Sequence, residues 1–147
     1  MGQEYESLQL TLAVPSVEET MAWYEHVFGW HGYCHMHSPE GECVFAAVLW
    51  REKPMGCINL SRCTDEGEYS NDGAHFYALL HVDDVDAVYA QVRAAGCKTL
   101  SAPQTEIWGG RSFDMLDLNG FRLMFVQWME DVSAEELQRR IDEGQAM

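Results

Sequence analysis

The sequence has 147 residues, of which 47% are hydrophobic, so we expect one folded domain with a substantial core rather than a disordered chain. Its formal net charge is −15, which argues against nucleic acid and anionic membranes as partners. The sequence contains no apolar run of the roughly 18 residues that a membrane span requires, and its first residues, MGQEYES, lack a secretory signal pattern, so a cytoplasmic location is expected.

The chain opens with an alternating segment, LQLTLAV, at residues 8–14. Leu10, Leu12 and Val14 would share one face of a strand, while Gln9 and Thr11 would lie on the other. Lys or Glu would serve as well on a face that met only solvent. The amide and the hydroxyl therefore suggest a face that lines a site.

A helix and three strands are predicted after this strand. Ser16 and Glu19 form a capping box, and apolar residues follow at helical spacing from residue 17 to residue 28. Turn signals in SPEG and REKP then separate three strand-like segments, Trp30–His37, Cys43–Trp50 and Gly56–Cys63.

The same plan repeats in the second half. A strand ends at Val82, Asp84 is the expected N-cap of a helix, and Gly96 suits the position after that helix. Three further strands are predicted at Lys98–Leu100, Ser112–Leu116 and Phe121–Trp128. The chain thus predicts an α+β fold of two βαβββ modules in a single domain, at about residues 8–63 and 74–128. A capped helix at about residues 133–144 ends it.

Cysteine usage predicts no cross-link. The five cysteines are an odd number without CxxC spacing, so we expect reduced thiols rather than disulfides or a structural zinc site. The tract Cys34-His35-Met36-His37 has the composition of a metal-binding segment, although exposed histidines on a hairpin are the simpler interpretation. The cysteines are Cys34, Cys43, Cys57, Cys63 and Cys97.

Two curved βαβββ sheets set edge to edge would enclose a cleft between their concave faces. Alternation places an apolar set toward the helices: Leu10, Leu12, Val14, Ile58, Leu60, Phe76, Ala78, Leu80, Val82, Leu123 and Phe125. The opposite set is polar, soft or aromatic, as in ligand pockets: Gln9, Thr11, Cys57, Asn59, Ser61, His75, Tyr77, His81, Arg122 and Met124.

At this point the sequence resembles a known family. LTLAVPSVEETMAWYEHVFGW, LLHVDDVDAVYAQVRAAG and WGGRSFDMLDLNGFRLMFV are similar, over about residues 8–128, to the vicinal oxygen chelate superfamily. That superfamily includes glyoxalase I, ring-cleaving dioxygenases, fosfomycin-resistance enzymes and bleomycin-resistance proteins. In its metal-dependent members, His, Gln or Glu from the first and last strands of each module hold a divalent metal.

By this resemblance the four metal positions fall on Gln9, Asn59, Tyr77 and Met124. Two amides, a phenol and a thioether supply no negative charge for a divalent ion. The resemblance therefore implies the metal-free branch, whose bleomycin-resistance members are dimers that sequester a drug. We expect no metal, no other cofactor and no catalytic residue.

The predicted function is the binding of a small aromatic molecule, such as an antibiotic, another natural product or a metabolite. The acidic chain would favour a cationic one, and Trp50, Trp108 and Trp128 are candidate stacking surfaces. The full candidate set is Gln9, Thr11, Trp50, Asn59, His75, Tyr77, His81, Trp108, Arg122 and Met124.

Two alternatives stay open. One is a metal-dependent lyase, isomerase or dioxygenase of the glyoxalase type, with His75 or His81 as an irregular ligand. The other is a regulatory or assembly module with a vestigial cleft. In each case the resemblance implies a homodimer, whose modules pair either within a chain or across chains.

Overall fold

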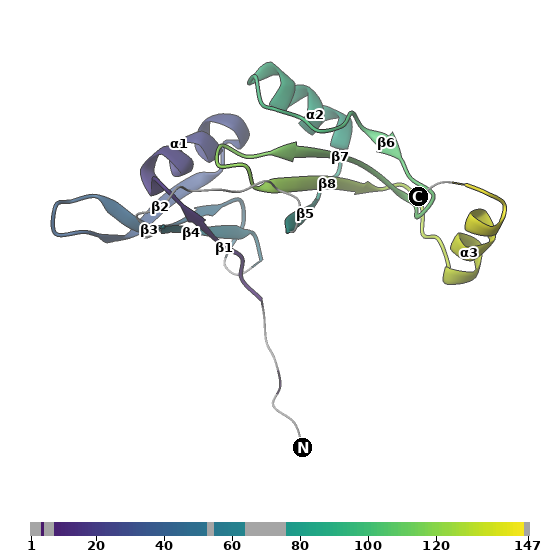
Figure 1. Cartoon of the computed structure of the whole chain (residues 1–147), viewed down its shortest axis with the longest axis horizontal. Coiled ribbons are helices and arrows are strands. Elements are labelled where there is room, and N and C mark those ends of the chain that lie inside the picture. Colours follow the sequence, from purple (N-terminus) through teal and green to yellow (C-terminus); the bar gives the residue numbers. More distant parts are fainter. Residues whose placement is uncertain (1–3, 5–7, 53–54, 64–75, 146–147) are drawn as a thin grey trace. The chain divides into compact units, whose positions relative to one another are not determined.

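The computed structural model describes residues 4, 8–52, 55–63 and 76–145 of the chain (Figure 1). The chain divides into two compact units, Met1–Ser70 and Asn71–Met147. Each unit contains a four-stranded sheet and a helix that packs on it. The predicted α+β fold of two βαβββ modules and a C-terminal helix is confirmed.

The first module pairs its first strand with its last. The sheet order is β1-β4-β3-β2, with β1 parallel to β4 and the other neighbours antiparallel. The elements are β1 (Thr11–Val14), α1 (Val17–Phe28), β2 (His31–His37), β3 (Cys43–Leu49) and β4 (Cys57–Arg62).

The second module repeats this topology. Its order is β5-β8-β7-β6, again with the first and last strands parallel. The elements are β5 (Tyr77–His81), α2 (Val85–Ala94), β6 (Gln104–Thr105), β7 (Gly110–Leu116) and β8 (Arg122–Trp128), followed by α3 (Ala134–Asp142).

All three helices begin at the caps that the sequence predicts. Ser16 Oγ accepts a hydrogen bond from Glu19 N, Asp84 Oδ1 from Ala87 N, and Ser133 Oγ from Glu136 N. Each bond satisfies a backbone donor in the first helical turn that has no partner within the helix.

The core of each module lies between its sheet and its helix. In the first module the buried apolar side chains are Leu12, Val14, Val17, Tyr24, Val27, Ala46, Val48, Ile58 and Leu60. In the second module they include Val85, Val92, Phe113, Met115, Leu123 and Phe125. The alternation that predicted the helix-facing set therefore holds for its central members.

The sequence prediction is wrong about the location of one strand and about the burial of one residue. Lys98–Leu100 is not a strand: only Thr99 forms a bridge, with Met115, and β6 lies further along at Gln104–Thr105. Pro103, which has no backbone N–H, separates the two segments. Phe76 is 61% exposed because β5 begins only at the next residue, so the alternation does not extend to it.

The prediction of five reduced thiols is also wrong. Cys34 of β2 and Cys43 of β3 form a disulfide, with a Cα–Cα distance of 6.1 Å. A register shift in the β2–β3 pair brings them together, which spacing in the sequence did not indicate. The cysteine pattern therefore gives no argument for a reducing compartment.

Within the described residues, the helices are all too short or too polar to cross a membrane.

Candidate functional site

The open face of the second sheet, opposite α2, carries most of the predicted site residues of this module. Phe113 of β7 contacts the ring of Tyr89 on α2, so the odd-numbered positions of β7 face the helix. Phe113 also stacks on Phe125 of β8, which fixes the orientation of that strand. The open face therefore holds the alternate residues: Tyr77, Leu79 and His81 of β5, Ser112 and Asp114 of β7, and Arg122 and Met124 of β8.

Arg122, the first residue of β8, makes two contacts on this face. Its guanidinium carbon is 4.6 Å from the ring centroid of Tyr77, its register partner across the strands, in cation–π geometry. The same guanidinium forms an ion pair with Asp114, whose side chain is only 13% exposed. The pair neutralises both charges, so neither is freely available to a ligand.

Trp108 is held in place by two glycines. The indole ring lies over Gly110, where a Cβ atom would stand 2.0 Å from its Cζ3 atom. Gly109 has a φ of 99°, and its carbonyl oxygen accepts hydrogen bonds from Met129 N and Glu130 N. The two glycines of the WGG sequence therefore allow this position of the indole ring, because Gly110 leaves space for the ring and Gly109 adopts a positive φ.

Trp128 links Trp108 to the imidazole of His81. The two indole rings meet edge to face with centroids 5.4 Å apart. Trp128 Nε1 donates a hydrogen bond of 2.9 Å to His81 Nδ1. In this arrangement His81 Nδ1 is the unprotonated nitrogen, and Trp108, Trp128 and His81 form one connected aromatic group.

A cavity of about 280 Å³ lies against this face. It is lined by Ser101, Ala102, Gln104, Glu106, Trp108, Ser112, Asp114, Arg122 and Met124. Glu106 forms no side-chain hydrogen bond or ion pair with any described residue. Its carboxylate is therefore available to a ligand in this cavity.

A second hollow, of about 540 Å³, shares the Trp108 wall. Its other lining residues are Trp128, Met129, Glu130, Asp131 and Val132. Both hollows combine an indole surface with acidic side chains.

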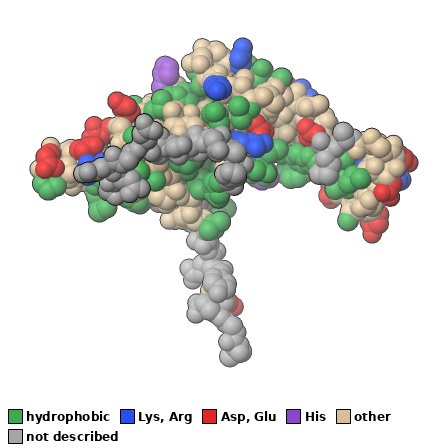
Figure 2. Space-filling model, viewed as in Figure 1, with side chains coloured by type: hydrophobic (Ala, Val, Ile, Leu, Met, Phe, Trp, Pro, Cys, Tyr) green, Lys and Arg blue, Asp and Glu red, His purple; other side chains and the backbone are tan. Residues whose placement is uncertain are grey.

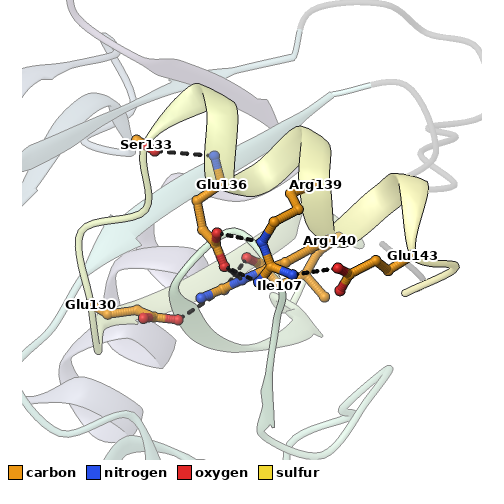
Figure 3. Close-up of polar contacts among 7 residues, drawn as sticks. All are labelled: Ile107, Glu130, Ser133, Glu136, Arg139, Arg140 and Glu143. Carbon is orange, nitrogen blue, oxygen red and sulfur yellow. Dashed lines mark hydrogen bonds and ion pairs between the residues drawn. The ribbon is translucent and has the colours of Figure 1, made fainter.

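Helix α3 is tied to the segment that carries Trp108 (Figure 3). Arg140 Nη1 donates to the backbone oxygen of Ile107 at 2.6 Å and pairs with Glu130 at 2.9 Å, while Nε contacts Glu136 at 3.0 Å. Within the part of the chain that the structure describes, Arg139 pairs with Glu136 and Glu143 of the same helical segment and with no residue outside it. Arg140 is therefore the residue that anchors α3 next to Trp108.

Electrostatics in α3 are dominated by these ion pairs. Hydrogen bonds from Arg139 and Arg140 lower the pKa of Glu136 to about 2. Figure 2 shows acidic side chains in red over the region of α3. The acidic residues of α3 and its C-cap are Glu135, Glu136, Asp142 and Glu143.

In the first module, the predicted residues Gln9 and Asn59 are in contact. Asn59 Nδ2 donates a hydrogen bond of 3.3 Å to Gln9 Oε1, and Asn59 is only 5% exposed. Thr11 is the register partner of Asn59, and its side chain is exposed. The three residues share the face opposite α1, as the alternation predicted.

Trp50, another predicted site residue, belongs to a cluster of aromatic side chains at the end of α1. Its ring contacts Trp30 at 4.4 Å, and Trp30 stacks on Phe28 at the end of α1. The structure therefore places Trp50 with the aromatic residues of the helix end, and not beside Asn59. His75 lies outside the described residues.

The comparison with known proteins decides the family. The profile of the Glyoxalase/Bleomycin resistance protein/Dioxygenase superfamily matches residues 7–125, most of the chain. The chain belongs to this superfamily. No match was found among curated proteins.

Solved structures of low sequence identity share the superfamily fold. A glyoxalase-related enzyme from Clostridium phytofermentans is similar with a TM-score of 0.71 and 19% identity, over 86% of this chain and 98% of that one. TioX from Micromonospora sp. ML1 is similar with a TM-score of 0.62 and 22% identity, over 87% and 100%. A glyoxalase/bleomycin resistance protein/dioxygenase from Nocardioides gives 0.64 and 16%, over 91% and 90%. At these identities the likeness shows the fold alone.

The residues at the superfamily's metal positions do not fit a divalent ion. Gln9 and Asn59 hydrogen-bond to each other as neutral amides, so neither offers a charged oxygen. Tyr77 offers a phenol that lies against the Arg122 guanidinium, and Met124 supplies a thioether. Hard and borderline divalent metals prefer carboxylates and imidazoles, and this donor set contains neither.

Several residues of the candidate site were missed from the sequence. Ser112, Asp114 and Leu79 follow the same alternation that identified Tyr77 and Met124, so extending that rule to every strand would have found them. Gln104 and Glu106 belong to β6 and the segment after it, which the sequence prediction placed elsewhere.

Proposed function

We propose that this protein binds a small planar cation on the open face of the second module, with Trp108 as the stacking surface and Glu106 as the counter-charge. The observation that carries the proposal is that both side chains line one cavity. An indole face and a carboxylate that has no partner among the described residues together favour an aromatic cation over a neutral or anionic molecule.

The charges around the cavity support this choice. Arg122 is the basic residue among the cavity-lining residues, and Asp114 neutralises it. The whole chain carries a formal net charge of −15, which raises the local concentration of cations. An anionic ligand would have to displace Asp114 from Arg122 before it found a positive partner.

The size of the cavity favours a small ligand. Ligand pockets typically measure about 300–1,000 Å³, and this cavity of about 280 Å³ lies at the lower limit of that range. The adjoining hollow across Trp108 offers space for a substituent. An antibiotic, another natural product or a metabolite with one or two fused rings meets these requirements.

Binding without chemistry is the function that the donor set supports best. The superfamily includes metal-dependent enzymes, but the residues at their metal positions here are two amides, a phenol and a thioether. Without a metal, the electrophile of glyoxalase-type and dioxygenase reactions is lacking. A homodimer, implied by the family resemblance, forms part of this proposal and is checked by native mass spectrometry.

The test is a tryptophan-fluorescence titration of the purified full chain with a planar acridinium cation. A planar naphthalene sulfonate of similar size is the matched anionic probe. We expect saturable quenching by the cation and none by the anion. The variant Trp108→Leu should weaken binding roughly tenfold, the loss expected from a desolvated cation–π contact of about 1–2 kcal/mol.

The carboxylate is tested by Glu106→Gln, which should weaken cation binding and reduce its dependence on salt. Glu40→Gln, an exposed glutamate in the β2–β3 turn, is the matched control and should bind as the unmodified protein does. Equal affinity for both probes, or no change in either site variant, would contradict the proposal. Near-stoichiometric metal in the purified protein, lost on Gln9→Ala or His81→Ala, would support the metal-dependent enzyme instead.

A further inference from the structure

The β2–β3 hairpin of the first module brings two cysteines and a histidine together. Cys34 and Cys43 are joined as a disulfide, and His37 Nδ1 lies 4.0 Å from Cys34 Sγ. His37 is also the register partner of Cys43 across the two strands. All three donor atoms therefore lie in one small region of the hairpin.

A β-bulge makes this grouping possible. In a regular strand, residues three positions apart point to opposite faces, so Cys34 and His37 would be separated by the sheet. The pairing of β2 with β3 shifts register between Cys34 and Met36 and again between Met36 and His37. These shifts change the direction in which the side chains of β2 point, so that the imidazole of His37 lies on the same side as the sulfur atoms.

We propose that reduction of this disulfide creates a binding site for a thiophilic divalent metal ion such as Zn²⁺, with Cys34 Sγ, Cys43 Sγ and His37 Nδ1 as ligands. A tetrahedral zinc site has Zn–S distances of about 2.3 Å and Zn–N distances of about 2.0–2.1 Å, which place S and N about 3.6 Å apart. The observed distance of 4.0 Å between Cys34 Sγ and His37 Nδ1 is close to this requirement.

The sulfur atoms need only separate by side-chain rotation. Two thiolates on one tetrahedral zinc lie about 3.8 Å apart, and the Cα atoms of Cys34 and Cys43, 6.1 Å apart, allow that distance without movement of the strands. Glu18 Oε1 accepts a hydrogen bond of 2.9 Å from Cys43 N, so a carboxylate from α1 lies at the same end of β3. Glu18 is the candidate for the fourth ligand or for an outer-shell partner.

The redox step balances with a thiol reductant. Two equivalents of a monothiol, RSH, convert the disulfide into two thiols and leave as RSSR, so two electrons and two protons pass to the cysteines. Cys34 is the more exposed residue of the pair and is the proposed point of attack, since Cys43 is only 2% exposed. Metal binding then displaces one proton from each thiol.

Disulfide and metal are therefore mutually exclusive states of the hairpin. With the disulfide formed, no group of three or more His, Cys, Asp and Glu side chains in the described part of the chain is placed to hold a metal. The proposed site is separate from the cavity of the second module and does not depend on the proposed function.

The experiment compares the oxidised full chain with the same protein reduced by a phosphine and freed of excess reductant. Zn²⁺ binding is measured by competition with a chromogenic chelator, and Co²⁺ binding by its thiolate charge-transfer absorption. The reduced protein should bind one ion per chain and the oxidised protein none. Either Cys34→Ser or His37→Asn should weaken binding by at least about tenfold.

Matched controls are present in the chain. Cys97→Ser removes another half-buried thiol, and His31→Asn removes another exposed histidine of β2, so both should bind as the reduced unmodified protein does. His37→Asn leaves the disulfide intact and thus tests the site in a protein that folds through its oxidised form. Absence of binding to the reduced protein would overturn the proposal, as would equal binding by His37→Asn and the unmodified chain.

Discussion

The indole ring of Trp108 lies over Gly110, so closely that a Cβ at Gly110 would stand 2.0 Å from Cζ3 of the ring. The backbone of Gly110 does not have a positive φ, so glycine is required there for space alone. The proposed stacking surface, Trp108, can therefore occupy its position only because residue 110 has no Cβ atom.

We expect Gly110→Ala to displace Trp108 and to destabilise the protein by about 1–3 kcal/mol, the usual cost of inserting a methyl group into a packed position. Thermal unfolding measures the stability, and acridinium titration measures the accompanying loss of binding. The double variant Gly110→Ala/Trp108→Leu should lose much less stability than the sum of the single variants, because the clashing ring is gone. Additive losses would show that the contact is not the cause.

Arg140 is expected to matter more than its neighbour Arg139. Arg140→Gln removes the hydrogen bond to Ile107 O and the pair with Glu130. The contacts that Arg139→Gln removes, among the described residues, lie within α3 and its C-terminal end. Amide hydrogen exchange should therefore speed up throughout α3 in Arg140→Gln, and Trp108 fluorescence should shift to the red. Arg139→Gln should change both readouts little, and an equal effect of the two variants would disprove the anchoring role.

Acid should loosen α3 through Glu136. The folded-state pKa of this carboxyl is lowered from 4.5 to about 2, so the stability it contributes is fully present above pH 4.5. That contribution declines as the pH falls toward 2, where the folded form also becomes protonated. Hydrogen exchange of α3 should thus accelerate over this range in the unmodified protein, relative to its rate at neutral pH after correction for intrinsic exchange.

Glu136→Gln should lack this component of the pH dependence. Asp86, whose pKa is also lowered by its hydrogen bond with Arg111, lies on α2 and not on α3. Asp86→Asn is therefore the control that should leave the pH response of α3 unchanged. An identical acid profile for α3 in Glu136→Gln and in the unmodified protein would contradict the assignment.

Removing either member of the Arg122–Asp114 ion pair should change the affinity for the cation, in opposite directions for the two residues. Arg122→Gln leaves an uncompensated carboxylate in the cavity and should tighten binding of the acridinium cation roughly three- to tenfold. Asp114→Asn leaves an uncompensated guanidinium and should weaken it by a similar factor. Both affinities are measured by fluorescence titration at low and high salt. A change of the same sign in the two variants would point to altered packing instead of charge.

Much of the fold was predictable because local signals agree with tertiary packing. The caps at Ser16, Asp84 and Ser133 are short-range hydrogen bonds, and the alternation in residues 10–14 and 121–128 reflects burial on one side only. Each of these features depends on residues that are close together in the sequence. The repeat of the two modules then identifies the topology.

The features that the sequence did not reveal depend on register. The disulfide between Cys34 and Cys43 exists because β2 contains a bulge, and no local residue pattern specifies where that bulge lies. The two-residue strand β6 pairs with β7 through Gln104 and Thr105, a segment too short to show an alternating pattern. The availability of Glu106 and the pairing of Asp114 likewise emerge only once the strands are aligned.

The amide pair of Asn59 and Gln9 has a consequence for how binding responds to the medium. Neither side chain ionises, so the hydrogen bond between them is the same in acid and in alkali. Histidine and glutamate at these positions would exchange protons with solvent whenever a ligand arrived. Contacts made with the amide pair are therefore independent of pH, and any proton uptake or release coupled to ligand binding must originate in other residues.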